Sequence, residues 1–335
     1  MPDTVYFHIG SIKTGSTGVQ KFCYEHRDAL LAAGVDYIQF HPPKLHLPRW
    51  ANADFLLQDG FDAAFVAARM AQSPAPSILI SEEGLMGRPH IWQHPVFAGM
   101  RRVIVLYLRN SVDLVASWAA ENSLPYNFSQ MEHASGQGVV SVDEGLGIWS
   151  DQYRGMLFTL CHAFASDPGL EVLLRPFPPR DPQGEALLPG FLRTLGITDP
   201  ATLALADQAG DEIVNQGQSR KYCDAAFLLS ELVKQHGLSP IYDTHFVLNI
   251  AARLRSGDDR KVIQTLNRLE MIFVQQRLLP PVRQLQSMFG GAEGLDALPP
   301  DFHLDRAPYS RIDLRELQDL FFEDVLRQHL SPRLG

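Results

Sequence analysis

Cysteine is scarce in this sequence, with Cys23, Cys161 and Cys223 as the only examples among 335 residues. Their number is odd, they lie far apart, and no two of them form a CxxC pair. This pattern excludes the dense cysteine framework of a small secreted protein that is held together by disulfides. A reducing compartment fits it best.

Long hydrophobic runs are also missing. No stretch approaches the ~20 apolar residues that a membrane-spanning helix needs, and the segment Met1–Gly10 lacks the basic start and the long apolar stretch of a signal peptide. The sequence contains no internal repeat and no low-complexity tail. We therefore expect a soluble cytoplasmic protein with no membrane span.

Positive charge is in deficit, because 29 lysines and arginines stand against 38 aspartates and glutamates and give a formal net charge of −9. This balance disfavours a general electrostatic attraction to nucleic acid or to an anionic membrane, and we expect no nucleic-acid partner. An anionic ligand must be held by a local site. The content of hydrophobic residues, 45%, is that of a globular protein with a sizeable core.

Short apolar runs alternate with helical patterns over the first two hundred residues, which is typical of a parallel sheet covered by helices. From about residue 215 the hydrophobic period becomes helical. We therefore expect an α/β protein, with an α/β core over residues 1–210 and a helical C-terminal layer over residues 211–335. One C-terminal helix is expected to run from Asp258 until Pro280–Pro281 ends it. The expected strands are Val5–Ile9, Val35–Phe40, Ser77–Ile80, Arg102–Leu108 and Leu170–Leu174.

A glycine-containing loop follows the first expected strand. The segment Ile9–Thr17 reads Ile-Gly-Ser-Ile-Lys-Thr-Gly-Ser-Thr and lies between that strand and a helix. Glycines allow the backbone to turn tightly with its N–H groups inward, and the start of the helix adds N–H donors and the positive end of its dipole. The hydroxyls of Ser16 and Thr17 add further donors. The loop is therefore expected to bind an anion.

The lysine of this loop stands in an unusual place. Gly10 and Gly15 have the separation of the two glycines in a nucleotide-binding P-loop, but Ser16 follows where an NTPase P-loop has lysine. The lysine is Lys13 instead. An NTPase lysine reaches the β- and γ-phosphates while the next hydroxyl holds Mg²⁺, and this sequence does not meet those requirements cleanly. The pattern favours a different anion.

The order of residues from Lys13 to Thr17 resembles the 5′-phosphosulfate loop of the sulfotransferases, the family that uses 3′-phosphoadenosine 5′-phosphosulfate (PAPS). A second segment strengthens the resemblance. The expected strand Arg102–Leu108 is followed by Arg109, and Ser117 stands eight residues further on, as in the 3′-phosphate motif of this family. Both segments follow the carboxyl ends of strands, where ligands bind in open α/β sheets.

The resemblance covers residues 4 to about 200 and points to cytoplasmic sulfotransferases of bacterial type. It implies a P-loop-like three-layer fold, PAPS as the sulfuryl donor and no metal. Where Ile12 stands, the family usually has proline. The residues that it assigns to the donor are Lys13, Thr14, Gly15, Ser16 and Thr17 around the 5′-phosphosulfate, with Arg109 and Ser117 around the 3′-phosphate.

Sulfuryl transfer needs a base for the proton of the acceptor and positive charge on the leaving phosphate oxygen. The resemblance gives the second role to Lys13. Two carboxylates, Glu82 and Glu83, follow the expected strand Ser77–Ile80, and their side chains point in opposite directions if the strand pattern continues. We expect Glu83 to be the base, with Glu82 as the alternative.

Histidine is the runner-up as base, because sulfotransferases that act on phenols and steroids use one. His41 and His46 lie in the loop after the second expected strand and could line an acceptor pocket. His8 lies inside the first expected strand, where we expect a core residue whose hydrogen bonds are satisfied.

The sequence therefore predicts a sulfotransferase that moves a sulfuryl group from PAPS to a hydroxyl or amine of a carbohydrate, lipid or other small molecule. Two alternatives stay open. One is a nucleotide-dependent kinase or NTPase with an altered P-loop, and the other is a protein of the same fold that binds the nucleotide without turnover. The acceptor and the oligomeric state are not visible in the sequence.

Overall fold

The computed structural model describes residues 2–11, 13–40, 50–57, 60–124, 140–177, 186–210, 218–235, 244–290 and 309–330. The chain divides into two compact units, each built from three segments. Unit 1 comprises residues 1–110, 153–215 and 279–297, and unit 2 comprises residues 111–152, 216–278 and 298–335.

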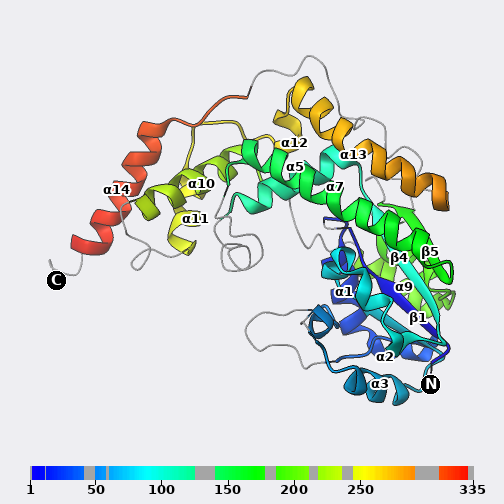
Figure 1. Ribbon diagram of the computed structural model, residues 1–335. Helices are drawn as coiled ribbons and strands as arrows, with labels where there is room; N and C mark the ends of the chain where they lie inside the picture. The colour runs from blue at the N-terminus through cyan, green and yellow to red at the C-terminus, as the bar shows by residue number, and fades with distance from the viewer. Residues whose placement is uncertain are drawn as a thin grey trace. The chain divides into compact units, whose positions relative to one another are not determined.

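Unit 1 contains a parallel sheet of five strands in the order β2-β3-β1-β4-β5 (Figure 1). The pairs β1–β3, β1–β4, β2–β3 and β4–β5 are all parallel. This sheet confirms the predicted α/β class, and it places β1 in the middle. The strands are β1 (Thr4–His8), β2 (Val35–Asp36), β3 (Ser77–Ser81), β4 (Arg101–Leu108) and β5 (Leu170–Pro176).

Helices cover both faces of the sheet. On one face, Tyr6 and Val105 belong to a buried cluster that also contains Phe22 of α1 (Ser16–Glu25) and Phe191 of α8 (Leu187–Thr194). On the other face, Phe7 meets the edge of Phe97 with 5.0 Å between ring centroids. The last six residues of β4 are all buried, as expected for a strand covered on both faces.

The helices and 3₁₀ turns before residue 101 are α1 (Ser16–Glu25), α2 (Arg27–Ala32), η1 (Asp54–Leu57), α3 (Ala63–Ala71), η2 (Glu83–Gly87), α4 (Pro89–Trp92) and η3 (Pro95–Phe97). After β5, unit 1 adds α8 (Leu187–Thr194) and α9 (Pro200–Ala209).

The second strand is shorter than the predicted Val35–Phe40, because only Val35–Asp36 pairs with β3. Side chains bind the carbonyls that would have continued the ladder. The Asn52 amide donates to the carbonyl oxygen of Ile38 at 2.9 Å, and the Arg69 guanidinium donates to that of Gln39 at 3.1 Å. The apolar pattern was correct, but it could not show which backbone groups find side-chain partners.

The regular elements described after residue 211 are all helices, in agreement with the predicted change of period. The predicted division at residue 210 itself stays a prediction. None of the described helices is both long and apolar enough to cross a bilayer. The helices that belong to unit 2 wholly or in part are α5 (Ser111–Asn122), α7 (Val142–Ser166), α10 (Arg220–Gln235), α11 (Thr244–Arg253), α12 (Val262–Thr265), α13 (Arg268–Phe289) and α14 (Leu314–Leu330).

The predicted helix from Asp258 to Pro280–Pro281 is two helices, of which the first begins at Val262, and the predicted stop at the prolines is wrong. Helix α12 ends at Thr265, and α13 begins at Arg268 and continues through both prolines to Phe289. Each proline removes one helical N–H donor, a loss that usually breaks a helix. Here the helix continues because buried apolar residues follow one another on its inner side, namely Leu278, Val282 and Leu285.

Candidate functional site

Three segments singled out in the sequence meet at one edge of the sheet in unit 1. The loop from Ile9 to Gly15 follows β1, Glu82 and Glu83 follow β3, and Arg109 follows β4. Because β1 lies between β3 and β4 and all three are parallel, their carboxyl ends are neighbours. Ligands of open α/β sheets bind at this edge, where the strand order reverses.

Among the described residues of the loop, three have a positive φ. They are Gly10 at 39°, Lys13 at 63° and Gly15 at 74°. Lys13 is the only non-glycine residue of this kind in the described part of the chain. A left-handed conformation costs an ordinary L-residue roughly 1–2 kcal/mol, and such strain is common at functional sites.

Hydrogen bonds hold the strained loop from within and from outside. The Thr14 hydroxyl donates to the carbonyl oxygen of Ser11, two residues before Lys13. The Ser11 hydroxyl is hydrogen-bonded to that of Tyr153 on α7, with 3.0 Å between the oxygens. Ser11, Thr14 and Tyr153 are all buried, so water competes little for these bonds.

The N-terminus of α1 completes the loop. Gly15 is the N-cap residue, and because it has no side chain it cannot accept the N–H groups of the first turn. The first turn, Ser16 to Gly18, carries no acidic side chain either. The positive end of the helix dipole therefore lies next to the loop together with the Ser16 and Thr17 hydroxyls, an arrangement that favours an anion.

Arg109 reaches the loop from the end of β4. Its Nη1 donates a hydrogen bond to the carbonyl oxygen of Lys13 at 2.8 Å. Its Cζ also lies 5.6 Å from the centre of the Phe177 ring, within the range of a cation–π contact. Arg109 is partly buried. The two segments that carry the sequence resemblance thus contact each other directly.

Phe177 was not singled out as a site residue by sequence reasoning. It follows β5, and its backbone N–H donates to the carbonyl oxygen of Leu108 at 2.6 Å, which extends the pairing of β4 and β5. A Cβ on Gly15 would lie 3.3 Å from the Phe177 ring and 2.6 Å from Leu187. The ring therefore packs under Arg109 and against the loop. Its position directly after a strand was the signal that could have revealed it.

The two carboxylates after β3 have different neighbours. Glu82 accepts a hydrogen bond from the N–H of Gly84 at 3.2 Å, and its charge adds to burial in raising the pKa of Tyr37. The Cγ of Glu83 lies 3.8 Å from the point where a Cβ on Gly10 would stand. Glu83 is thus the carboxylate beside the loop.

His8 is only half satisfied, although the sequence predicted a fully satisfied core residue. Its Nδ1 lies 2.8 Å from the Ser81 hydroxyl, the residue opposite it in the β1–β3 register. Its Nε2 is buried and has no hydrogen-bond partner among the described residues. Burial lowers the pKa of His8 from its ordinary value of 6.5 to about 4, so the imidazole is neutral at physiological pH.

The structure does not describe every residue that was named from the sequence. His41, His46 and Ile12 lie outside the described residues. Ser117 lies on α5, which belongs to unit 2, and its predicted contact with a 3′-phosphate stays a prediction. Within the ranges that the structure describes, no group of three or more His, Cys, Asp or Glu side chains is arranged to hold a metal ion.

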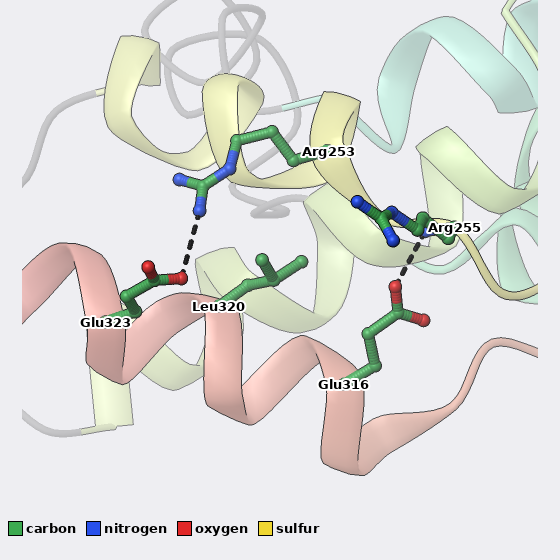
Figure 2. A pocket seen from close by; sticks show the side chains of 5 residues that line it. All are labelled: Arg253, Arg255, Glu316, Leu320 and Glu323. Atoms are coloured by element: carbon green, nitrogen blue, oxygen red, sulfur yellow. Dashed lines mark hydrogen bonds and ion pairs between the residues drawn. The ribbon is translucent and has the colours of Figure 1, made fainter.

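Unit 2 has a surface hollow of its own, between the end of α11 and helix α14 (Figure 2). Its charged groups bind one another. Arg253 pairs with Glu323 at 3.3 Å, and the Glu316 carboxylate accepts hydrogen bonds from the backbone N–H groups of Arg255 and Ser256. The groups that line the hollow therefore join α14 to the end of α11, and the hollow is part of the packing of unit 2. The residues lining it are Arg253, Arg255, Glu316, Leu320 and Glu323.

Comparison of the chain with protein-family models, with curated proteins and with solved structures gives no match.

Proposed function

We propose that this protein is a PAPS-dependent sulfotransferase whose donor site is the carboxyl edge of the sheet in unit 1. The observation that carries the proposal is the hydrogen bond from Arg109 to the carbonyl oxygen of Lys13. The loop and the arginine were identified separately, from two segments of sequence 96 residues apart, and each was expected to hold a phosphate of the same nucleotide. Their direct contact supports a single site for a doubly anionic ligand.

The proposed reaction requires an acceptor oxygen in line with the donor, a positive charge near the leaving phosphate and a base, all at this edge. The oxygen of the acceptor attacks the sulfur of PAPS, and the bond between that sulfur and the bridging phosphate oxygen breaks in line with the attack. Lys13 stabilises the negative charge that develops on the leaving phosphate. Glu83 takes the proton of the acceptor, and adenosine 3′,5′-bisphosphate leaves with the second phosphate still attached.

The position of Glu83 supports its role as base over that of Glu82. Glu83 lies beside Gly10, whereas Glu82 caps the turn η2 and influences Tyr37. A base must come within hydrogen-bond reach of the proton that it removes. A loop histidine, His41 or His46, remains the other alternative named from the sequence.

One observation favours a kinase or NTPase as the second candidate. Glu82 and Glu83 follow β3, the strand next to β1, where a carboxylate could bind the Mg²⁺ of a nucleotide. Against it stands Ser16, which occupies the position of the P-loop lysine. If ATP with Mg²⁺ raised the melting temperature and the bisphosphate did not, this candidate would replace the first.

A turnover assay tests the proposal. The protein is incubated in EDTA with PAPS labelled in its sulfuryl group and with a panel of sugars, lipids and small phenols and amines. We expect transfer of label to at least one acceptor by the wild type and none by Lys13→Ala. Bisphosphate binding without any transfer across a broad panel would instead favour a nucleotide-binding protein that lacks turnover.

A further inference from the structure

The open side of His8 faces the anion loop. A Cβ built on Gly10 would lie 3.6 Å from the Nε2 of His8, 3.5 Å from the Cβ of Ser16 and 3.8 Å from the Cγ of Glu83. These are ordinary contact distances, so the space between the three side chains has room for about one methyl-sized group. The unpartnered nitrogen thus borders a small space at the first glycine of the loop, next to the start of α1.

The hydrogen-bond chain behind His8 determines which nitrogen carries the proton. The Tyr37 hydroxyl donates its only proton to the carbonyl oxygen of Trp50 at 2.6 Å. The Ser81 side chain lowers the pKa of Tyr37, as a hydroxyl that donates toward the Tyr37 oxygen does, which directs the Ser81 proton to that side. The oxygen of Ser81 can then only accept from Nδ1 of His8 at 2.8 Å. In the neutral imidazole, Nε2 consequently carries a lone pair.

A lone pair facing a loop that is built to bind anions is electrostatically mismatched with them. A proton on Nε2 removes the mismatch without disturbing the chain behind it, because Nδ1 already donates to Ser81. An imidazolium would then donate from both nitrogens. Burial opposes that charge in the absence of an anion, and a bound anion would offset this cost.

We propose that His8 is the proton-accepting residue of the anion loop, and that its Nε2 takes one proton from solvent when a phosphate or sulfate group binds and then donates to that anion. The proposal depends only on the anion-binding part of the proposed function and not on sulfuryl transfer. Because His8 takes up a proton on binding, the affinity of the loop for anions rises as the pH falls.

Few charged groups face His8. Tyr107 of β4 lies 6.1 Å away and Phe191 of α8 lies 5.0 Å away, measured between ring centroids. Glu83 is the nearby carboxylate. Burial is the only cause of the lowered pKa of His8, so the charge of Glu83 does not raise that pKa again. Lys13 and Arg109 bring positive charge to the same loop, which leaves a bound anion as the group that would favour the imidazolium.

Nuclear magnetic resonance of protein labelled with ¹⁵N in its histidine rings tests the proposal, with adenosine 3′,5′-bisphosphate as the probe. His8→Gln identifies the His8 signals by their loss. We expect the Nε2 signal of His8 to change from that of a lone-pair nitrogen to that of a protonated nitrogen as the bisphosphate saturates the protein at pH 6.5. Binding that leaves this signal in its lone-pair form would overturn the inference and leave the proposed function intact. An absence of binding would count against both.

Two substitutions provide a matched pair in a binding titration, because each replaces one nitrogen of the ring. The side-chain amide of Gln can place a permanent donor near Nε2, and that of Asn can place one near Nδ1. We expect His8→Gln to bind the bisphosphate within threefold of the wild type and to lose the part of the pH dependence that His8 supplies, and His8→Asn to bind at least tenfold more weakly. Equal affinity and an equal pH profile in all three proteins would overturn the inference.

Discussion

Arg109 donates a hydrogen bond from its Nη1 to the carbonyl oxygen of Lys13, with 2.8 Å between the two atoms. This bond connects the end of β4 to the one strained non-glycine residue in the described part of the chain, whose φ is 63°. Arg109 therefore has two effects on the proposed site. It holds the backbone that presents the Lys13 side chain, and it would offer a planar group of donors to the proposed anion.

Replacing Arg109 tests both effects. We expect Arg109→Ala to weaken binding of adenosine 3′,5′-bisphosphate by about 1.5–3 kcal/mol, the usual effect of losing a hydrogen bond to a charged group. Arg109→Lys should recover only part of this loss, because an ammonium cannot reproduce a planar fork of donors. Arg27→Ala, on the exposed surface of α2, is the control and should bind like the wild type.

Two substitutions of Lys13 can separate the effect of backbone strain on stability from the effect of the ammonium group on activity. Glycine adopts a φ of 63° without the penalty that alanine has there, so Lys13→Gly should be more stable than Lys13→Ala by roughly 1 kcal/mol. Both variants lack the ammonium group and should lose sulfuryl transfer. Urea unfolding and the PAPS assay measure the two quantities. Identical unfolding midpoints would show that the loop imposes no strain at this position.

Two glycines of the same region provide a matched comparison. A Cβ on Gly15 would meet Leu187 at 2.6 Å, and its φ is 74°, whereas a Cβ on Gly18 would have nothing within 4 Å. We expect Gly15→Ala to lower the free energy of unfolding by roughly 1–3 kcal/mol and to impair anion binding. Gly18→Ala, inside α1, should instead stabilise the protein by about 0.5–1 kcal/mol. Equal effects of the two substitutions would contradict the loop geometry.

The two carboxylates after β3 should separate binding from turnover. Glu83→Gln keeps the shape of the side chain and removes the base, so the bisphosphate should bind as before while transfer falls by roughly 10²–10⁴-fold. Glu82→Gln should have a much smaller effect, since the Gln oxygen can still accept from the N–H of Gly84. If Glu82→Gln were the inactive variant, the assignment of the base would be reversed. Full activity in both variants would favour a histidine as base.

The pKa of His8 predicts how stability depends on pH. It is about 4 in the folded protein, against about 6.5 in an unfolded chain, so between these values the unfolded state binds more protons. The contribution of His8 to the free energy of unfolding should thus be fully present above pH 6.5. It should be lost as the pH falls toward 4, by roughly 3 kcal/mol in total. His8→Gln should lack this component. Urea midpoints of both proteins at pH 7.5 and 4.5 measure the difference, and parallel pH profiles would refute it.

The local parts of this account could be predicted from the sequence. The order of glycines, lysine and hydroxyls around Lys13 is a property of consecutive residues, and the apolar run before Arg109 is long enough to indicate a buried strand. Since both segments follow parallel strands, their meeting at one edge followed from the fold class. The observed strands β1, β3, β4 and β5 agree with the predicted ones to within one or two residues at each end.

The parts that depend on distant side chains could not be predicted. The free lone pair of His8 arises from Ser81 of β3 and from Tyr37, which follows β2, and no local pattern reveals which nitrogen of a histidine is satisfied. The early end of β2 arises from Asn52 and Arg69 in the same way. The prolines inside α13 show the reverse case, in which burial of neighbouring residues overrides a strong local signal.

Calorimetric titration of the purified protein with adenosine 3′,5′-bisphosphate in EDTA shows whether Lys13 and Arg109 hold one nucleotide together. We expect one site per chain with micromolar or tighter affinity, and a loss of affinity of roughly 10- to 150-fold in Arg109→Ala, which corresponds to the hydrogen bonds of one charged group. No heat of binding at micromolar protein, or an affinity that Arg109→Ala and Lys13→Ala both leave unchanged, would contradict the proposed site.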